Sequence, residues 1–402
     1  MIRHSLRKYI SQWLRESISL IVRIFYAIII VILNKKLKTQ SNSNAIVVSR
    51  IDRIGDFIIW LDAAKELQRL YPDKAITLLC LSPCTHIAEA TGYFDTIIPL
   101  SIGLVYSLNP CRKWQLRRML HGIKADILLQ CIYSRSLAAD YVSSCVAATQ
   151  KITPDSDSAN IRSVVRKISN IIYDKIIAVP STNAHELEHN AELLHGLGLS
   201  YSTAPQLLPY FESRIVPAEK YFVIFAGARD EDRRWSTNNF ASVADYIIAN
   251  HNLACCLCGS SDDTGTSQQL INTALCEIKY NLTGRTSITD LIEIIRNAEF
   301  IISNDTSAIH IAVGTNTPSI CVLGPWELGK VLPYKANKTD GRTLPILCYS
   351  DMVCRQCHLH KIMHITKECK KNIIKNNRRL CIDKVSPEIV IKEVEGILKY
   401  SK

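Results

Sequence analysis

Residues 301–324 restrict the fold of this 402-residue chain more than any other stretch. An apolar run at 300–302 stops at a polar turn, a helical pattern then continues to Gly314, and a second apolar run covers 319–323. A strand, a turn, a helix and a strand in this order are the repeating unit of an open parallel sheet. The segment therefore predicts an α/β fold.

The polar turn of this unit carries Asp305, Thr306 and Ser307 at the start of the predicted helix. Side chains of these types cap free N–H groups, and the helix dipole adds positive potential at the same end. Turns at the carboxyl ends of parallel strands are where α/β proteins hold phosphate. The segment is consistent with an anion site, and also with an ordinary capped helix in the core.

The rest of the chain alternates short apolar strands with helical patterns on both sides of a proline-containing segment at 207–219. A chain of this length favours two domains, and the alternation predicts two doubly wound parallel sheets facing a cleft. The predicted parts are a basic and apolar segment with a linker (1–44), a first Rossmann-like domain (45–212) and a second one (213–402). The predicted strands span 45–49, 75–81, 96–100, 125–130, 144–148, 175–179, 221–225 and 253–258, and the predicted helices include 185–196, 238–250, 267–275 and 288–297.

An apolar run at 18–33 lies among basic residues, which contribute to a formal net charge of +11. Its sixteen residues, interrupted by Arg23, fall short of the ~20 that span a bilayer. The pattern favours a helix lying on the cytoplasmic face of an anionic inner membrane. A single span and a buried core helix are the alternatives. Nucleic acid is not favoured as a partner, because the charges surround an apolar segment and no interleaved aromatic motif occurs.

The turn after the first predicted strand reads RIDRIGDF at 50–57. Gly55 allows a close backbone turn, and Arg50, Asp52 and Arg53 place charge beside it. Asp56 stands at the entry of the next helix, where a carboxylate can cap the helix or act as a general base. We therefore regard Asp56 as the candidate catalytic residue, with the four other residues shaping the turn or the acceptor side.

The two turns, taken with three further segments, resemble the heptosyltransferases of glycosyltransferase family 9. The resemblance extends over about residues 45–390. It rests on five motifs in order: RIDRIGDF at 50–57, FAGAR at 225–229 followed by RRW at 233–235, NLTG at 281–284 with Leu291, NDTSAIHIA at 304–312 with GTNTP at 314–318, and Gly324-Pro325.

The resemblance implies a GT-B fold and inverting transfer from a nucleotide-diphosphate sugar, typically ADP-heptose, to a lipopolysaccharide-core or other surface glycan. It implies no cofactor, and it gives Asp56 the role of general base. Gly227 and Arg234 would hold the donor diphosphate, Arg234 standing where relatives carry a lysine before the tryptophan. Further donor-side residues by this resemblance are Asp305, Thr306, Ser307, Ala308 and His310. Ser307 replaces a usual glycine, and His310 is equally well explained as a core histidine.

Fifteen cysteines without a signal-peptide cleavage pattern indicate reduced thiols and a cytoplasmic location. Four of them form a cysteine-rich loop at 354–381: Cys354, Cys357, Cys369 and Cys381. A structural zinc site, packed reduced thiols and disulfides are the three interpretations of this loop. Two other functions share the motifs, a nucleotide-sugar epimerase of the same fold and a non-catalytic, membrane-anchored nucleotide-sugar binder.

Overall fold

The computed structural model describes residues 2–35, 43–180, 184–324, 328–329, 331–334, 341–350 and 380–400. The chain forms two compact units, each assembled from separate stretches of sequence. Unit 1 consists of Met1–Asp52, Leu67–Thr182 and Glu192–Ser200, and unit 2 of Arg53–Glu66, Asn183–Ala191 and Tyr201–Lys402. The predicted boundaries at 44/45 and 212/213 stay predictions.

Unit 1 is built on a six-stranded sheet in the order β3-β2-β1-β4-β5-β6, and every neighbouring pair is parallel. The central strand β1 is buried from its second residue onward because both of its faces are covered, which explains the apolar run at 45–48. The strands are β1 (Ala45–Arg50), β2 (Ala75–Leu81), β3 (Thr96–Leu100), β4 (Lys124–Gln130), β5 (Ala147–Pro154) and β6 (Lys175–Ile177). Its helices are α1 (Ile2–Lys35), α3 (Thr85–Thr91), α4 (Ile102–Val105), α5 (Pro110–Leu120), α6 (Leu137–Cys145) and α7 (Ser163–Ser169), with 3-10 turns η1 (Ser82–Cys84) and η2 (Asn170–Ile172).

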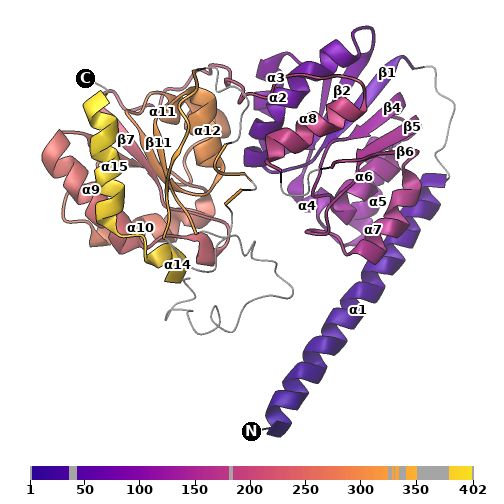
Figure 1. The fold of residues 1–402 in the computed structure, drawn as a ribbon, viewed down its shortest axis with the longest axis horizontal. Helices are drawn as coiled ribbons and strands as arrows, with labels where there is room; N and C mark the ends of the chain where they lie inside the picture. Colours follow the sequence, from indigo (N-terminus) through magenta and orange to yellow (C-terminus); the bar gives the residue numbers. More distant parts are fainter. Residues whose placement is uncertain are drawn as a thin grey trace. The chain divides into compact units, whose positions relative to one another are not determined.

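Unit 2 contains a second parallel sheet, which includes the strands β7 and β11 labelled in Figure 1. The strand order is β12-β11-β10-β7-β8-β9. The strands are β7 (Tyr221–Phe225), β8 (Ala254–Leu257), β9 (Tyr280–Asn281), β10 (Ile301–Asn304), β11 (Ser319–Val322) and β12 (Ile346–Cys348). The helices are α9 (Thr237–His251), α10 (Thr264–Thr273), α11 (Ile288–Arg296), α12 (Ser307–Thr315), α14 (Leu380–Asp383) and α15 (Pro387–Tyr400), with 3-10 turns η3 (Glu231–Arg233) and η4 (Ser261–Asp263). Two further helices, α2 (Ile54–Leu70) and α8 (Glu186–Gly196), each belong partly to this unit.

The prediction of two doubly wound parallel sheets is confirmed. One predicted strand, at 144–148, is wrong over its first half, because those residues finish α6 and the strand β5 begins only at Ala147. The side chain of Ser136 caps this helix by accepting a hydrogen bond from the Ala139 N–H. The strand β12 escaped prediction because three residues give too short a periodic signal.

The N-terminal apolar helix is also confirmed, since α1 runs unbroken from Ile2 to Lys35. Its segment Ile18–Lys35 is long and apolar enough to cross a membrane by length and composition. The second half of α1 packs beside α6, α7 and η2 within unit 1 (Figure 1).

Candidate active site

The loop that follows β7 is fixed to the end of β10 by one buried side chain, Asn304. Its Nδ2 donates to the carbonyl oxygens of Ala226 at 2.7 Å and Gly227 at 3.2 Å, and its Oδ1 accepts from the Trp235 N–H at 2.9 Å. Asn304 thereby uses both ends of its amide to hold the two ends of the loop. The loop after the first strand of unit 2 and the turn at 304–307 are thus brought to one place on the sheet edge.

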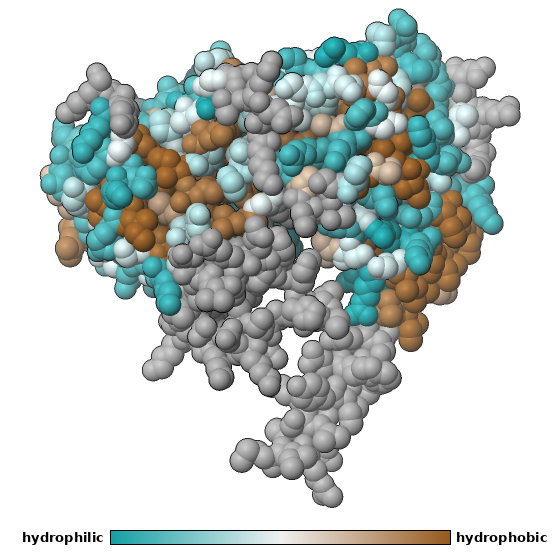
Figure 2. Space-filling view, viewed as in Figure 1, coloured by the Kyte–Doolittle hydropathy of each residue, from teal (hydrophilic) through white to brown (hydrophobic). Residues whose placement is uncertain are grey.

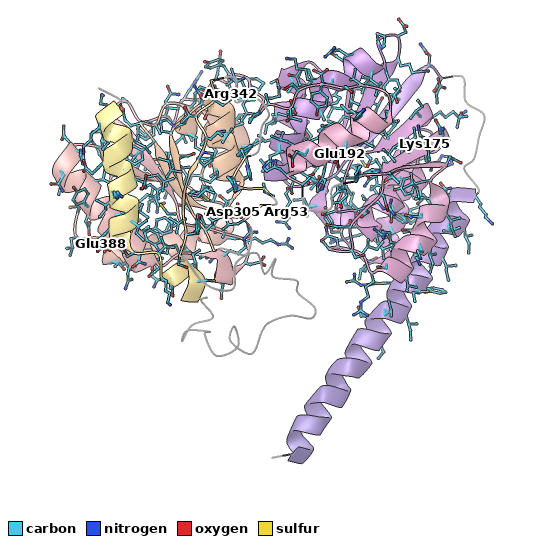
Figure 3. The ribbon with its side chains drawn as sticks, viewed as in Figure 1. Arg53, Lys175, Glu192, Asp305, Arg342 and Glu388 are labelled. Atoms are coloured by element: carbon cyan, nitrogen blue, oxygen red, sulfur yellow. The ribbon has the colours of Figure 1, made fainter. Side chains whose placement is uncertain are left out.

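Arg233 reaches the start of α12 from this loop. Its Nη2 donates to the Asp305 carboxylate at 2.5 Å and to the Asp305 carbonyl oxygen at 3.3 Å. The Asp305 side chain is largely buried, whereas about a quarter of the Arg233 side chain, 26%, is exposed. Asp305, labelled in Figure 3, therefore orients a guanidinium that keeps a solvent-facing side at the helix N-terminus.

Arg234 points to a different group of residues. Its Nε donates to the Ala228 carbonyl oxygen at 2.8 Å, its Nη1 to Thr266 Oγ1 at 3.2 Å, and its Nη2 lies 3.5 Å from Asp263 Oδ1. These contacts tie the loop to η4 and α10. Arg234 therefore does not reach Asp305, and its assignment to the donor diphosphate stays a prediction. The sequence could not reveal these contacts, because side-chain direction in an irregular loop has no periodicity.

Gly227 is required by the close approach of Asp263. A Cβ atom added to Gly227 would lie 2.3 Å from Asp263 Cγ, far inside van der Waals contact. The carboxylate cannot move away freely, because its Oδ2 accepts from the Ser260 N–H at 2.9 Å and from Ser260 Oγ at 2.7 Å. The glycine of the predicted phosphate loop therefore leaves space for a protein carboxylate.

This packing predicts opposite effects for two glycine substitutions. Gly227→Ala should lower the free energy of unfolding by about 1–3 kcal/mol, since the methyl group has no room. The matched control is Gly265→Ala in α10, where an added Cβ meets nothing within 4 Å; it should stabilise by about 0.5–1 kcal/mol, as alanine favours helix. Urea denaturation of both variants measures the difference. Equal free energies of unfolding for the two variants would show that the Asp263 carboxylate moves aside without destabilising the fold.

The N-terminus of α12 is capped by Thr306, whose Oγ1 accepts a hydrogen bond from the Ala308 N–H at 3.3 Å. Ser303 Oγ lies 3.1 Å from the same Thr306 oxygen. Ser307 begins the helix, and Ala308 is fully buried. The first turn of α12 therefore combines a positive helix end with the Arg233 guanidinium, a pairing suited to a diphosphate.

His310 is a buried histidine on the inner side of α12. Its Nδ1 lies 2.7 Å from the Tyr334 hydroxyl, and its ring packs edge-on against the Tyr334 ring. Burial lowers the pKa of His310 to about 4, and the nearby Arg233 and His185 act in the same direction against Asp305. His310 is therefore neutral at physiological pH.

The His310 environment predicts a pH-dependent stability. Because the folded pKa lies below the ordinary value of 6.5, the unfolded chain binds the proton first as the pH falls. The contribution of His310 to the free energy of unfolding should be fully present above pH 6.5 and decrease as the pH falls toward 4. The slope from this group should approach about 1.4 kcal/mol per pH unit. Denaturant titrations of the wild type and of His310→Gln across this range test it. A variant whose slope matches the wild type would remove His310 as the cause.

Asp56 lies in the first turn of α2, which starts beside α12 within unit 2. A Cβ added to the preceding Gly55 would lie 2.9 Å from His310 Cδ2 and 3.5 Å from Ser307 Cα. Only a residue without a side chain allows this approach. Gly55 therefore packs against the first turns of α12, and the candidate base Asp56 is the next residue in the sequence.

Three other residues of the 50–57 motif lie at the end of β1 or just before α2. Arg50 is fully buried in unit 1, where its Nη1 donates to the Cys131 carbonyl oxygen at 2.6 Å and its Nε pairs with Asp52 Oδ2 at 2.8 Å. This pair organises the end of β1. Arg53 precedes α2, accepts the Phe57 N–H at 2.9 Å through its carbonyl oxygen, and is labelled in Figure 3.

The predicted cysteine-rich loop falls mostly outside the described residues, which include only Cys381 of its four cysteines. Cys381 is buried, and its carbonyl oxygen accepts from Ser350 Oγ. Within the described ranges no group of histidine, cysteine or acidic residues is placed to hold a metal ion. The cysteines described there are free thiols, most of them buried.

The sequence did not identify the residues that hold the site loop in place or pack around His310. Asn304 was quoted only as part of a motif, although an asparagine that ends a buried strand is a signal for a backbone clamp. Asp263 sits in a Ser-x-x-Asp capping box that the sequence displays at 260–263. Tyr334 and His185 gave no sequence signal, since they approach His310 only through the tertiary fold.

The chain matches a known protein family and several known proteins. The family Glycosyltransferase family 9 (heptosyltransferase) matches residues 113–362, more than half of the chain. Lipooligosaccharide heptosyltransferase 2 of Haemophilus influenzae is 29% identical over 96 residues, which cover 23% of this chain and 28% of that protein. The protein of the same name from Campylobacter jejuni is 22% identical over 171 residues, or 42% of this chain and 48% of the relative. The chain thus spans less than half the length of these curated relatives.

Solved structures match over most of the chain. A glycosyl transferase family 9 protein from Veillonella parvula has a TM-score of 0.68 at 18% identity, covering 90% of this chain and 99% of that one. The ADP-heptose lps heptosyltransferase II of E. coli has a TM-score of 0.63 at 15% identity, covering 89% and 99%. The two parallel sheets and this likeness define a protein of the GT-B class. By the family match, the chain belongs to glycosyltransferase family 9, the heptosyltransferase family.

Proposed function

We propose that this protein is an inverting glycosyltransferase that needs no metal and transfers heptose from ADP-heptose to a lipopolysaccharide-core or related surface glycan. The observation that carries the proposal is the Arg233–Asp305 pair at the N-terminus of α12, beside α2, whose first turn contains Asp56. Family membership and a solved relative described as E. coli heptosyltransferase WaaC with ADP (15% identity, TM-score 0.61) support the choice of donor.

In the proposed reaction, the Asp56 carboxylate removes the proton from the acceptor hydroxyl as its oxygen attacks the anomeric carbon. The bond from that carbon to the diphosphate oxygen breaks, and ADP leaves with the electron pair. The N–H groups of the first turn of α12 and the Arg233 guanidinium stabilise the charge that grows on the diphosphate. Asp305 keeps Arg233 in place, and Gly227, Arg234 and Asn304 hold the loop that presents it.

We also propose that the enzyme works at the cytoplasmic face of the inner membrane, where a glycolipid acceptor would be available. The apolar and basic α1 supports this location.

The test is incubation of the purified protein with ADP-heptose and other nucleotide sugars, with and without a lipopolysaccharide core acceptor that lacks heptose. Release of ADP that requires the acceptor, together with a product heavier by one heptose, is the expected result. Interconversion of the donor sugar without acceptor would identify an epimerase instead. Binding of the donor, detected by thermal shift, with no nucleotide released under any condition would identify a non-catalytic binder.

A further inference from the structure

We propose that α1 is a docking helix that lies in the plane of an anionic membrane surface, with one face on the lipid and the opposite face packed on unit 1. This inference specifies the membrane association proposed above and does not depend on the reaction. The helix has a buried inner face and an exposed outer face.

The inner face of α1 is part of the unit 1 core. Ala27 and Ile30 are fully buried and Asn34 is 4% exposed, at the i, i+3, i+7 spacing of one helix side. Lys151 Nζ donates to Asn34 Oδ1 at 2.7 Å and to the Ser143 carbonyl oxygen at 2.6 Å. Removing α1 from the unit would leave the buried Lys151 ammonium without one of its partners, at substantial cost.

Aromatic contacts hold the same face. Tyr26 of α1 stacks on Tyr141 of α6 with ring centroids 5.8 Å apart. Lys113 Nζ lies 4.6 Å from the Tyr141 ring centre and 5.6 Å from that of Tyr26. A helix packed in this way cannot be surrounded by lipid, so a spanning orientation would require these contacts to break.

The outer face of α1 is an apolar stripe exposed to solvent. At 100° per residue its members fall within an arc of roughly 120° on the side opposite the buried residues. Figure 2 shows hydrophobic residues gathered over this stretch of α1 in unit 1. The members, with their exposed fractions, are Ile18 (57%), Ile21 (65%), Val22 (53%), Phe25 (64%), Ile28 (42%) and Ile32 (52%).

The neighbouring α7 and η2 carry further exposed apolar residues. They pack beside α1 through Val165, which shares a small core with Ala27. Their outward residues are Val164, 56% exposed, Ile171, 62% exposed, and the exposed Lys167 between them. Apolar side chains interleaved with a lysine suit the boundary between headgroups and acyl chains.

Charge identifies the occupant as anionic lipid. Residues 2–35 contain six basic residues (Arg3, Arg7, Lys8, Arg15, Arg23, Lys35) and one acidic residue (Glu16), a net charge of +5. Anionic headgroups attract a helix whose basic residues lie near the membrane surface. A second copy of the chain would bring a helix of the same charge to the same face, which opposes dimerisation there.

Vesicle binding of the full-length protein tests the docking face. The protein should co-sediment with phosphatidylcholine vesicles that contain phosphatidylglycerol and much less with phosphatidylcholine alone. Phe25→Glu should weaken binding about tenfold or more, because an exposed aromatic ring that would enter the lipid is replaced by a charge. Leu275→Glu is the matched control: its side chain is 92% exposed, it lies in unit 2, and binding should be unchanged. Equal binding by wild type and Phe25→Glu would overturn the proposal.

Protease protection separates a docked helix from a spanning one. A tag placed before Met1 should be digested in inverted inner-membrane vesicles, since both ends of a docked helix stay on the cytoplasmic side. A protected tag would show that α1 spans the membrane and would overturn the proposal. The proposal would also be overturned if the wild-type protein did not bind vesicles but self-associated, and if Phe25→Glu abolished that self-association. Transfer to a soluble acceptor analogue by Phe25→Glu should persist, so loss of docking and failure of the proposed reaction give different results.

Discussion

Asp56→Asn should lower kcat for heptose transfer by about 10²–10⁴-fold, the range expected when a general base is removed. The amide keeps the size and a hydrogen-bonding oxygen of the carboxylate but cannot accept the acceptor proton. Donor affinity should stay near that of the wild type, because the substitution removes no positive charge from the helix end at Arg233. Steady-state kinetics and donor titration by calorimetry measure the two quantities separately.

Asp52→Asn is the matched control for this variant. Asp52 lies four residues earlier and pairs with the buried Arg50 at 2.8 Å, so its loss should reduce stability more than kcat. Turnover by Asp52→Asn should stay much closer to that of the wild type than turnover by Asp56→Asn. Near-normal turnover by Asp56→Asn would leave Asp56 as a helix cap and require another base.

The sheet strands could be predicted from sequence because most of their residues are apolar and form short runs. The strands at 75–81, 96–100 and 221–225 agree with prediction at both ends. Their boundaries are marked by polar turns, which the sequence displays directly. The capped turn at 305–307 was likewise visible, because a cap and a helix start are local features.

The direction of individual side chains in the loop at 226–236 could not be predicted. Two adjacent arginines offer the same chemistry, and only the fold decides which one faces Asp305 and which one faces Asp263. The Gly55 contact with His310 is also non-local, since 255 positions separate the two residues in the sequence. Such contacts depend on the packing of whole elements, which no short pattern encodes.

The assignment of the two arginines leads to the second large prediction. Arg233→Ala should lower kcat/KM by an amount that corresponds to about 2–4 kcal/mol of lost transition-state stabilisation. This is the scale expected for losing one preorganised hydrogen-bond donor. The effect should fall more on kcat than on donor affinity, because the charge on the diphosphate grows as the glycosidic bond breaks. Arg233→Lys should recover part of the loss, since it restores the charge but not the planar guanidinium whose Nη2 reaches Asp305.

Arg234→Ala separates this role from loop stability. Arg234 ties the Ala228 carbonyl oxygen to Thr266 and Asp263, so its loss should lower the free energy of unfolding and affect kcat less than Arg233→Ala. Measuring both variants by denaturation and by single-turnover kinetics distinguishes a destabilised loop from a lost cation. If Arg234→Ala abolishes turnover in a stable protein while Arg233→Ala is active, the diphosphate is held on the Asp263 side of the loop and the site proposed at α12 is wrong.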